Sequence, residues 1–211
     1  MARLLIIGAS RGIGLEAVKI GLEAGHQIRA FARSANDIAI THPSLEKISA
    51  SALDRQAVDE AVENIDAVIT TLGTPPTLQH VHLFSGTART VTEVMKAKGV
   101  RKLIAVTGIG AGDSRGTGGP LYSRLFQPLF LGTIYEDKDL EEKIIQASGL
   151  DWVIVRPGYL TRLPKTGTYR ALINPKDWQG GFITRTDVAD FLIKQVDRDE
   201  FVGKTPLLIS S

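Results

Sequence analysis

Short apolar runs that do not alternate with polar residues are the feature of this sequence that most constrains its fold. Each run is followed by a segment whose apolar residues recur at helical spacing. Strands that are apolar at every position are buried on both faces, and their alternation with helices is typical of a parallel sheet with helices on both sides. We therefore predict one doubly wound α/β domain over residues 1–211, with strands at 4–7, 27–31, 45–48, 67–70, 102–106, 152–155 and 207–209.

Capping signals predict where several helices begin and end. The first helix ends near Gly25, Asp54 begins the second, and the Thr184-x-x-Asp187 pattern is typical of a capping box. Two further helices are predicted over 85–98 and 137–147. The segments 108–135 and 158–182 are long for simple connections, so we expect them to form substrate-side loops.

Composition excludes several classes of function. The 25 Lys and Arg residues against 23 Asp and Glu residues give a net charge of only +2, without a dense basic run, so we expect no nucleic-acid or membrane partner. The absence of cysteine excludes a disulfide framework, a cysteine nucleophile and cysteine-ligated zinc. His80 and His82 are too few to make a metal site, and we expect none. No signal peptide or membrane span is indicated, and we expect a cytoplasmic protein.

A glycine-rich loop follows the first predicted strand directly. The sequence Gly8-Ala9-Ser10-Arg11-Gly12-Ile13-Gly14 opens the first helix, and this placement is what favours dinucleotide binding. Gly8 permits a tight turn, Gly12 lets the backbone approach a diphosphate, and Gly14 lets the helix pack against the strand. The alternative is a glycine-rich turn without a ligand.

The end of the second predicted strand indicates which dinucleotide is bound. NAD-binding domains place a carboxylate there, whereas this strand ends in Arg33 and Ser34, with no acidic residue before Asp37. Arg33, together with Arg11 of the glycine loop, is suited to bind a 2′-phosphate, so the pattern favours NADP(H). The alternative is two solvated surface arginines.

Further segments extend over nearly the whole chain and carry a family resemblance. They are Thr71–Thr74, Val106–Gly108, Leu160–Thr161, Thr166–Tyr169, Ile183–Asp190 and, most specific of all, Lys138–Gly158. With the glycine loop, they make the sequence similar to the short-chain dehydrogenases/reductases. It most resembles their atypical NAD(P)H-binding branch, which includes NmrA-like proteins and biliverdin reductase B.

The resemblance implies a Rossmann-type parallel sheet of about seven strands, with the cofactor across the carboxyl ends of the strands. By position, Ser51 and Leu53 would flank the adenine, although many relatives have Asp at the position of Ser51. The remaining contacts implied by the resemblance are Leu72, Gly73 and Thr74 along the ribose and diphosphate, Thr107 and Gly108 under the nicotinamide, and Pro157, Gly158 and Leu160 over it. The glycine loop departs in spacing from the relatives closest to biliverdin reductase B.

The catalytic residues of the family are only partly matched. Short-chain dehydrogenases use a Tyr-x-x-x-Lys pair; Lys138 fills the lysine position, but Ile134 stands where tyrosine is expected. Tyr135, one residue later, would share a helical face with Lys138 if both are helical, but Glu136 and Asp137 resemble first-turn residues and favour a loop position for Tyr135. Lys138 is either a ribose contact or a solvated lysine. Thr107 either faces the substrate or bonds to the backbone.

Two functions remain open from the sequence. One is an NADPH-dependent reductase that transfers hydride to a small planar acceptor, such as a flavin, a quinone or a carbonyl compound; Arg162 and Lys165 would favour an anionic one. The other is an NmrA-like sensor that binds NADP(H) without catalysis, which the missing tyrosine favours. The sequence does not determine the oligomeric state.

Overall fold

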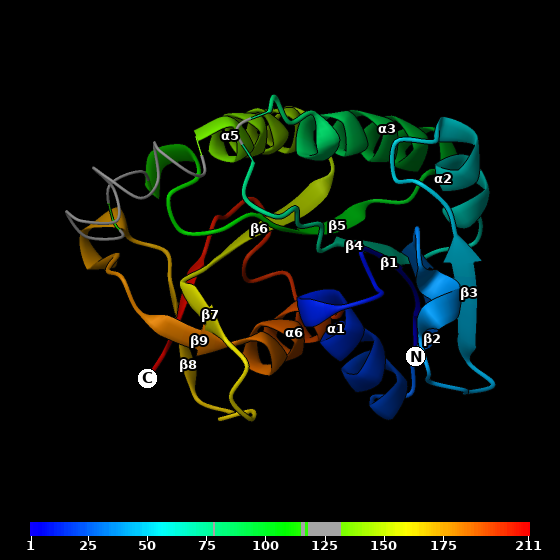
Figure 1. Cartoon of the computed structure of the whole chain (residues 1–211), viewed down its shortest axis with the longest axis horizontal. Helices are drawn as coiled ribbons and strands as arrows, with labels where there is room; N and C mark the ends of the chain where they lie inside the picture. The colour runs from blue at the N-terminus through cyan, green and yellow to red at the C-terminus, as the bar shows by residue number, and fades with distance from the viewer. Residues whose placement is uncertain (78, 115–116, 118–131) are drawn as a thin grey trace.

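A mostly parallel sheet runs through the middle of the computed structural model, which describes residues 1–77, 79–114, 117 and 132–211 (Figure 1). Within these residues the strand order is β3-β2-β1-β4-β5-β6-β10-β8. The strands are β1 (Arg3–Ile7), β2 (Gln27–Ala32), β3 (Leu45–Ser49), β4 (Ala67–Thr70), β5 (Lys102–Val106), β6 (Asp151–Pro157), β8 (Tyr169–Leu172) and β10 (Leu207–Ser210).

The sheet differs from the predicted parallel sheet of about seven strands by one edge strand, β8. Seven strands are parallel, but β8 pairs with β10 in antiparallel register, from Leu207 opposite Leu172 to Ser210 opposite Tyr169. The β8 sequence, Tyr-Arg-Ala-Leu, has no continuous apolar run, because only edge contacts bury it. The predicted α/β class with a doubly wound sheet is confirmed, with one additional strand.

Helices cover both faces of the sheet. The helices α2 (Arg55–Ala61), α3 (Leu83–Lys98) and α5 (Gly132–Gln146) lie on one face, and α1 (Gly12–Glu23) and α6 (Arg185–Lys194) lie on the other (Figure 1). Alternate residues of β1 enter separate cores: Leu4 and Ile6 join the core on the α1 and α6 side, whereas Leu5 and Ile7 join the other. This explains why the strand is apolar at every position.

A short parallel pair, β7 (Tyr159–Thr161) and β9 (Phe182–Thr184), leads into α6 and was not predicted. The remaining elements are the 3-10 turns η1 (Ala35–Asp37), η2 (Gly112–Ser114) and η4 (Pro175–Asp177). The predicted substrate-side loop at 108–135 lies largely outside the described residues, which include 108–114, 117 and 132–135 of this segment. No helix in the described part of the chain is long and apolar enough to cross a membrane.

The predicted caps of two helices are confirmed. The Asp54 carboxylate accepts hydrogen bonds from the amides of Gln56 and Ala57, and the Thr184 hydroxyl accepts one from the Asp187 amide. The start of α5 differs from the prediction, because it begins at Gly132 rather than 137. Asp137 does not cap its own helix.

Asp137 instead caps another helix, α3. Its carboxylate accepts from the amides of Phe84, at 2.8 Å, and Ser85, at 3.4 Å, and so caps the start of α3. That helix begins at Leu83 rather than 85, and the residue before it, His82, provides no side-chain cap.

Candidate dinucleotide site

The glycine loop links the end of β1 to α1 in a tight turn. Gly8 has φ +90°, and its amide donates to the carbonyl of Phe31 on β2 at 2.9 Å. A side chain at Gly14 would overlap the carbonyl oxygen of Gly8 and the hydroxyl of Thr71. The close helix–strand packing predicted for Gly14 is therefore confirmed, and Ile13 beside it is buried in the core.

Gly12 differs from the other two glycines because the space above it is open. It has φ +60°, and a methyl group placed there would meet no atom closer than Cδ of Arg185, at 3.9 Å. The chain thus leaves room at the start of α1, where helix amides without partners favour an anion. This fits the diphosphate of a dinucleotide.

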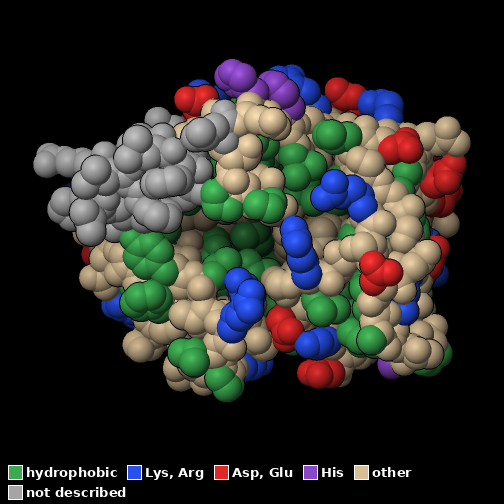
Figure 2. Space-filling view, viewed as in Figure 1, with side chains coloured by type: hydrophobic (Ala, Val, Ile, Leu, Met, Phe, Trp, Pro, Cys, Tyr) green, Lys and Arg blue, Asp and Glu red, His purple; other side chains and the backbone are tan. Residues whose placement is uncertain are grey.

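The two arginines predicted to bind a 2′-phosphate lie beside this loop. Arg11 is the exposed N-cap residue of α1, and Arg33 is exposed directly after β2, followed by the exposed Ser34. Within the described residues neither guanidinium makes a hydrogen bond or an ion pair. Lys and Arg side chains gather beside a hollow in the middle of the face seen in Figure 2, over the region where Figure 1 places the start of α1. These residues fit a phosphorylated dinucleotide.

The residues predicted to flank the adenine and ribose lie at the same edge of the sheet. Leu53 is half exposed and packs against Gly86 of α3, and its amide donates to the Ser51 hydroxyl at 3.3 Å. Leu72, Gly73 and Thr74 follow β4, and Ser10 is partly buried in the glycine loop. Their contacts with a cofactor stay predictions.

Tyr135 and Lys138 converge on the turn after β5. The Tyr135 hydroxyl donates to the Ile109 carbonyl at 2.9 Å, and it would lie 3.6 Å from a methyl group at Gly108. Lys138 Nζ donates to the Thr107 carbonyl at 3.0 Å and lies 4.2 Å from the centre of the Phe84 ring. The pair therefore lies at the position predicted for the nicotinamide.

The structure overturns the loop position expected for Tyr135 and excludes one of the two alternatives for Lys138. Tyr135 is not a loop residue, because α5 begins before it. Lys138 is not a solvated lysine: its side chain is buried, and burial lowers its pKa. Ile134, at the family's tyrosine position, is buried.

The Thr107 side chain is buried, and its hydroxyl bonds to a side chain rather than to the backbone. It donates to Glu142 Oε1 at 2.7 Å. Arg156 donates to the same carboxylate through Nε at 3.0 Å and through a second nitrogen at 2.6 Å, and it also pairs with Asp113. This buried network was missed, although Arg156 lies in the most specific block of the resemblance. Its partners are distant in sequence, and spacing could not reveal them.

The segment after β6 lies beside this network. Pro157 and Gly158 are buried, the Gly158 amide donates to the Leu208 carbonyl at 2.9 Å, and Leu160 on β7 is partly exposed. Arg162 is exposed. The Lys165 ammonium pairs with Asp190 of α6 at 2.6 Å, so this charge already has a protein partner.

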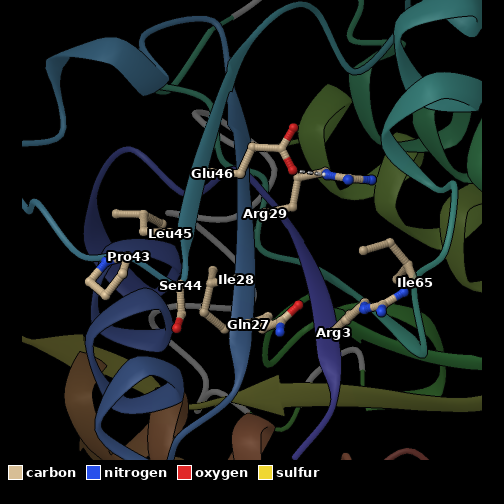
Figure 3. Close-up of a pocket in the computed structure, with 9 residues that line it drawn as sticks. All are labelled: Arg3, Gln27, Ile28, Arg29, Pro43, Ser44, Leu45, Glu46 and Ile65. Carbon is tan, nitrogen blue, oxygen red and sulfur yellow. Dashed lines mark hydrogen bonds and ion pairs between the residues drawn. The ribbon is translucent and has the colours of Figure 1, made fainter.

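Two cavities lie at different edges of the sheet. One of about 300 Å³ lies at the amino ends of β1, β2 and β3, lined by Arg3, Gln27, Arg29, Leu45 and others (Figure 3). Parallel sheets bind their ligands at the opposite, carboxyl edge, so we do not assign it to the dinucleotide. The second, of about 400 Å³, is lined by residues 74–77 and 79–83 and adjoins the predicted cofactor edge.

The second cavity includes His80 and His82, whose rings stack with centroids 6.4 Å apart. In the described part of the chain, no group of three or more His, Cys, Asp or Glu side chains is arranged to hold a metal ion.

Known proteins with similar sequences and structures agree with a dinucleotide site. The model of the NAD(P)H-binding family matches residues 8–199, so the chain belongs to that family. An uncharacterised sugar epimerase of Bacillus subtilis, YhfK, is 29% identical over 92% of this chain and 88% of its own.

Two solved structures show the same fold. ChuY, described as an anaerobillin reductase from Escherichia coli O157:H7, is 25% identical, with a TM-score of 0.83 over 99% of this chain and 97% of its own. A short-chain dehydrogenase/reductase from Veillonella parvula, solved with NADP, is 15% identical, with a TM-score of 0.82 over 99% of this chain and 94% of its own. The chain therefore belongs to a family of NAD(P)H-binding proteins and has the fold of the short-chain dehydrogenases/reductases.

Proposed function

We propose that this protein is an NADPH-dependent reductase that passes hydride to a small, planar acceptor such as a flavin, a quinone or a carbonyl compound. The observation that carries the proposal is that two groups of side chains lie at the carboxyl edge of the sheet: a pair of arginines, and a tyrosine with a lysine. Arg11 and Arg33, which lack protein partners among the described residues, lie beside the glycine loop, and Tyr135 and Lys138 lie against the turn after β5.

The preference for NADPH follows from the first group. Bound NADPH supplies the hydride, and the chain supplies binding and orientation. Each arginine keeps its charge, and an unneutralised guanidinium at the end of β2 favours a 2′-phosphate over the two hydroxyls of NADH. No carboxylate stands at the end of β2 to bind those hydroxyls.

The second group supports a reductase whose acceptor needs no strong acid. The Tyr135 hydroxyl already donates to a backbone carbonyl, and Lys138 Nζ donates to the Thr107 carbonyl. A conjugated acceptor, which takes up hydride and then a proton from solvent, suits this arrangement. The cavity at Thr74–Leu83 adjoins the same edge and offers space for such a molecule.

The test is NADPH consumption against a panel of flavins, quinones and aldehydes. Anaerobillin joins the panel because ChuY, of similar fold, is described as its reductase. We expect steady oxidation of NADPH with at least one conjugated acceptor. Binding of NADPH without turnover of any acceptor would contradict the reductase proposal.

The second candidate is an NADP(H)-binding sensor without catalysis. The observation that favours it is the buried Ile134 at the family's tyrosine position. A sensor would change its structure on exchange of NADP⁺ for NADPH, so comparison of hydrogen exchange in the two complexes separates it from a reductase.

A further inference from the structure

Arg185, the first residue of α6, reaches toward the glycine loop. A methyl group at Gly12 would lie 3.9 Å from its Cδ and 4.0 Å from its Nε. The side chain is partly buried, and within the described residues it makes no hydrogen bond or ion pair. A guanidinium is always charged, and one that no carboxylate neutralises, beside the open start of a helix, is placed to contact an anion.

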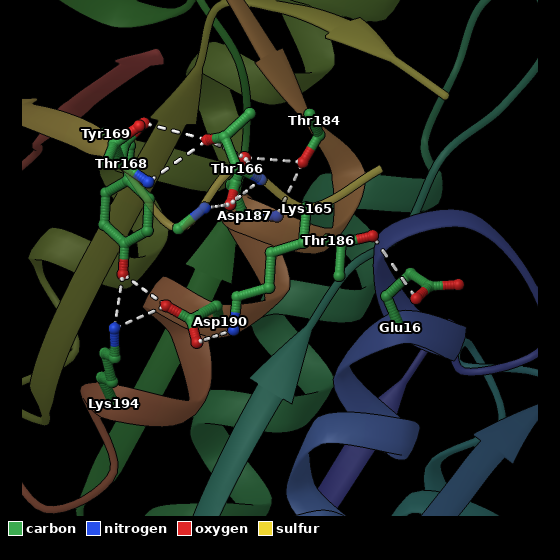
Figure 4. Close-up of polar contacts among 11 residues, drawn as sticks. Glu16, Lys165, Thr166, Thr168, Tyr169, Thr184, Thr186, Asp187, Asp190 and Lys194 are labelled. Atoms are coloured by element: carbon green, nitrogen blue, oxygen red, sulfur yellow. Dashed lines mark hydrogen bonds and ion pairs between the residues drawn. The ribbon is translucent and has the colours of Figure 1, made fainter. Parts of the chain in front are cut away.

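The start of α6 is held firmly in this position (Figure 4). Asp187 is fully buried, and its carboxylate accepts hydrogen bonds from the Thr184 hydroxyl at 2.8 Å and from the amides of Thr166 and Gly167 at 3.1 and 2.9 Å. These contacts fix the first turn of the helix, so the backbone of Arg185 is anchored on both sides. Only the side chain remains free to adjust to a ligand.

A direct contact also links the two helix starts. The Thr186 hydroxyl donates to Glu16 of α1 over 3.5 Å, and α1 and α6 pack side by side (Figure 4). The nearby Glu16 carboxylate is itself paired with Lys19 at 2.8 Å, so it does not neutralise Arg185.

We propose that Arg185 binds the diphosphate of the dinucleotide, a role that rests on the proposed cofactor site. Gly12 has no side chain, so a diphosphate has room to approach the backbone there. The Arg185 side chain borders this open space. Arg33, by contrast, lies after β2, where the adenosine ribose and its 2′-phosphate would bind. The two arginines therefore serve different phosphates.

The experiment is calorimetric titration of NADPH and NADH into wild type, Arg185→Ala and Arg33→Ala. The diphosphate is common to both dinucleotides, so Arg185→Ala weakens NADPH and NADH by the same factor, about tenfold or more. Arg33→Ala weakens only NADPH. Arg185→Lys keeps the charge without the planar fork and retains part of the affinity.

Arg170→Ala is the matched control, because it removes an exposed arginine from β8, at the far edge of the sheet, and leaves both affinities unchanged. Thermal unfolding shows that each variant is folded before titration. Wild-type affinity of Arg185→Ala for both dinucleotides overturns the proposal, and so does a loss confined to NADPH. If wild type binds neither dinucleotide, the proposed function itself fails, which is a distinct result.

Discussion

Arg29, near the amino edge of the sheet, and three arginines near its carboxyl edge have opposite surroundings. At the amino edge, Arg29 donates to Glu46 at 2.6 Å and to the carbonyls of Ala61 and Glu63, which join β2 to β3 and to the end of α2 (Figure 3). At the carboxyl edge, Arg11, Arg33 and Arg185 have no such partners among the described residues.

This difference distinguishes an arginine that stabilises the fold from arginines that are available to bind a ligand. Arg29 contacts a carboxylate and two carbonyls, so its guanidinium stabilises the chain and offers little to an anion. Arg11, Arg33 and Arg185 gain no such stabilisation from the described residues, and Arg185 borders an open glycine loop. The amino-edge cavity is therefore bordered by an arginine that protein groups already bind, whereas at the carboxyl edge an anion could bind the three arginines.

The largest effect is expected from Gly12→Val. The side chain would enter the space assigned to the diphosphate, so NADPH affinity should fall by at least ~100-fold, or about 2.7 kcal/mol. Fluorescence titration measures it. Gly25→Val is the matched control, because Gly25 also has a positive φ, +80°, and open space, but lies at the other end of α1. Both variants carry similar backbone strain. Equal loss of affinity in both would show that strain, not the site, is responsible.

The second prediction sharpens the contrast between the edges. Wild type should bind NADPH at least ~10-fold more tightly than NADH, and Arg33→Ala should remove most of this difference. The matched change at the amino edge, Arg29→Ala, should lower thermal stability and leave the NADPH-to-NADH ratio unchanged, because its partners are protein groups. Similar affinities of wild type for the two dinucleotides would contradict the assignment of Arg33.

These contrasts also explain what the sequence could predict. The buried strands, the glycine loop and the caps at Asp54 and Thr184 depend on residues close together in the chain, and local pattern is sufficient for them. The role of Asp137 depends on α3, more than fifty residues away in sequence. The spacing of apolar residues along the sequence cannot reveal such a contact.

The same limit applies to the site. The placement of Arg11 and Arg33 follows from the ends of two strands, which sequence locates. Arg185 reaches the glycine loop only because α6 packs beside α1, and the Thr107–Glu142–Arg156 network joins three separate elements. These residues were found only in three dimensions.

The third prediction concerns Tyr135, at the carboxyl edge. Tyr135→Phe keeps the ring and removes the hydroxyl that donates to Ile109. Because that proton is directed at the backbone, kcat with a conjugated acceptor should fall by less than about tenfold, whereas loss of a general acid costs ~10²–10⁴. Steady-state kinetics measures it. A thousandfold fall in kcat with an unchanged KM for NADPH would make Tyr135 the proton donor.

The smallest effect on cofactor binding is expected from the buried charges of α5, which lie behind the site. Burial raises the pKa of Glu141 to about 7, above its usual value near 4.5, although Lys138 opposes this; one of its carboxylate oxygens has no hydrogen-bond partner in the described residues. Between these two values the folded state keeps a proton that the unfolded state releases. Stability should therefore fall as pH rises through this range and level off above pH 7.

Glu141→Gln removes this titration, so the fall in stability between pH 5 and 7 should largely disappear, with NADPH affinity unchanged. The free energy of unfolding that is lost between the two pKa values corresponds to about 1.4 kcal/mol for each unit by which the pKa is raised. Denaturant unfolding at several pH values measures it, and Glu136→Gln, at an exposed position of the same helix, is the control. Lys138, Glu142 and Asp137 also face this carboxylate: the charge of Lys138 lowers the pKa of Glu141, whereas the charges of Glu142 and Asp137 raise it. An unchanged slope in Glu141→Gln would mean that Glu141 stays ionised in the fold.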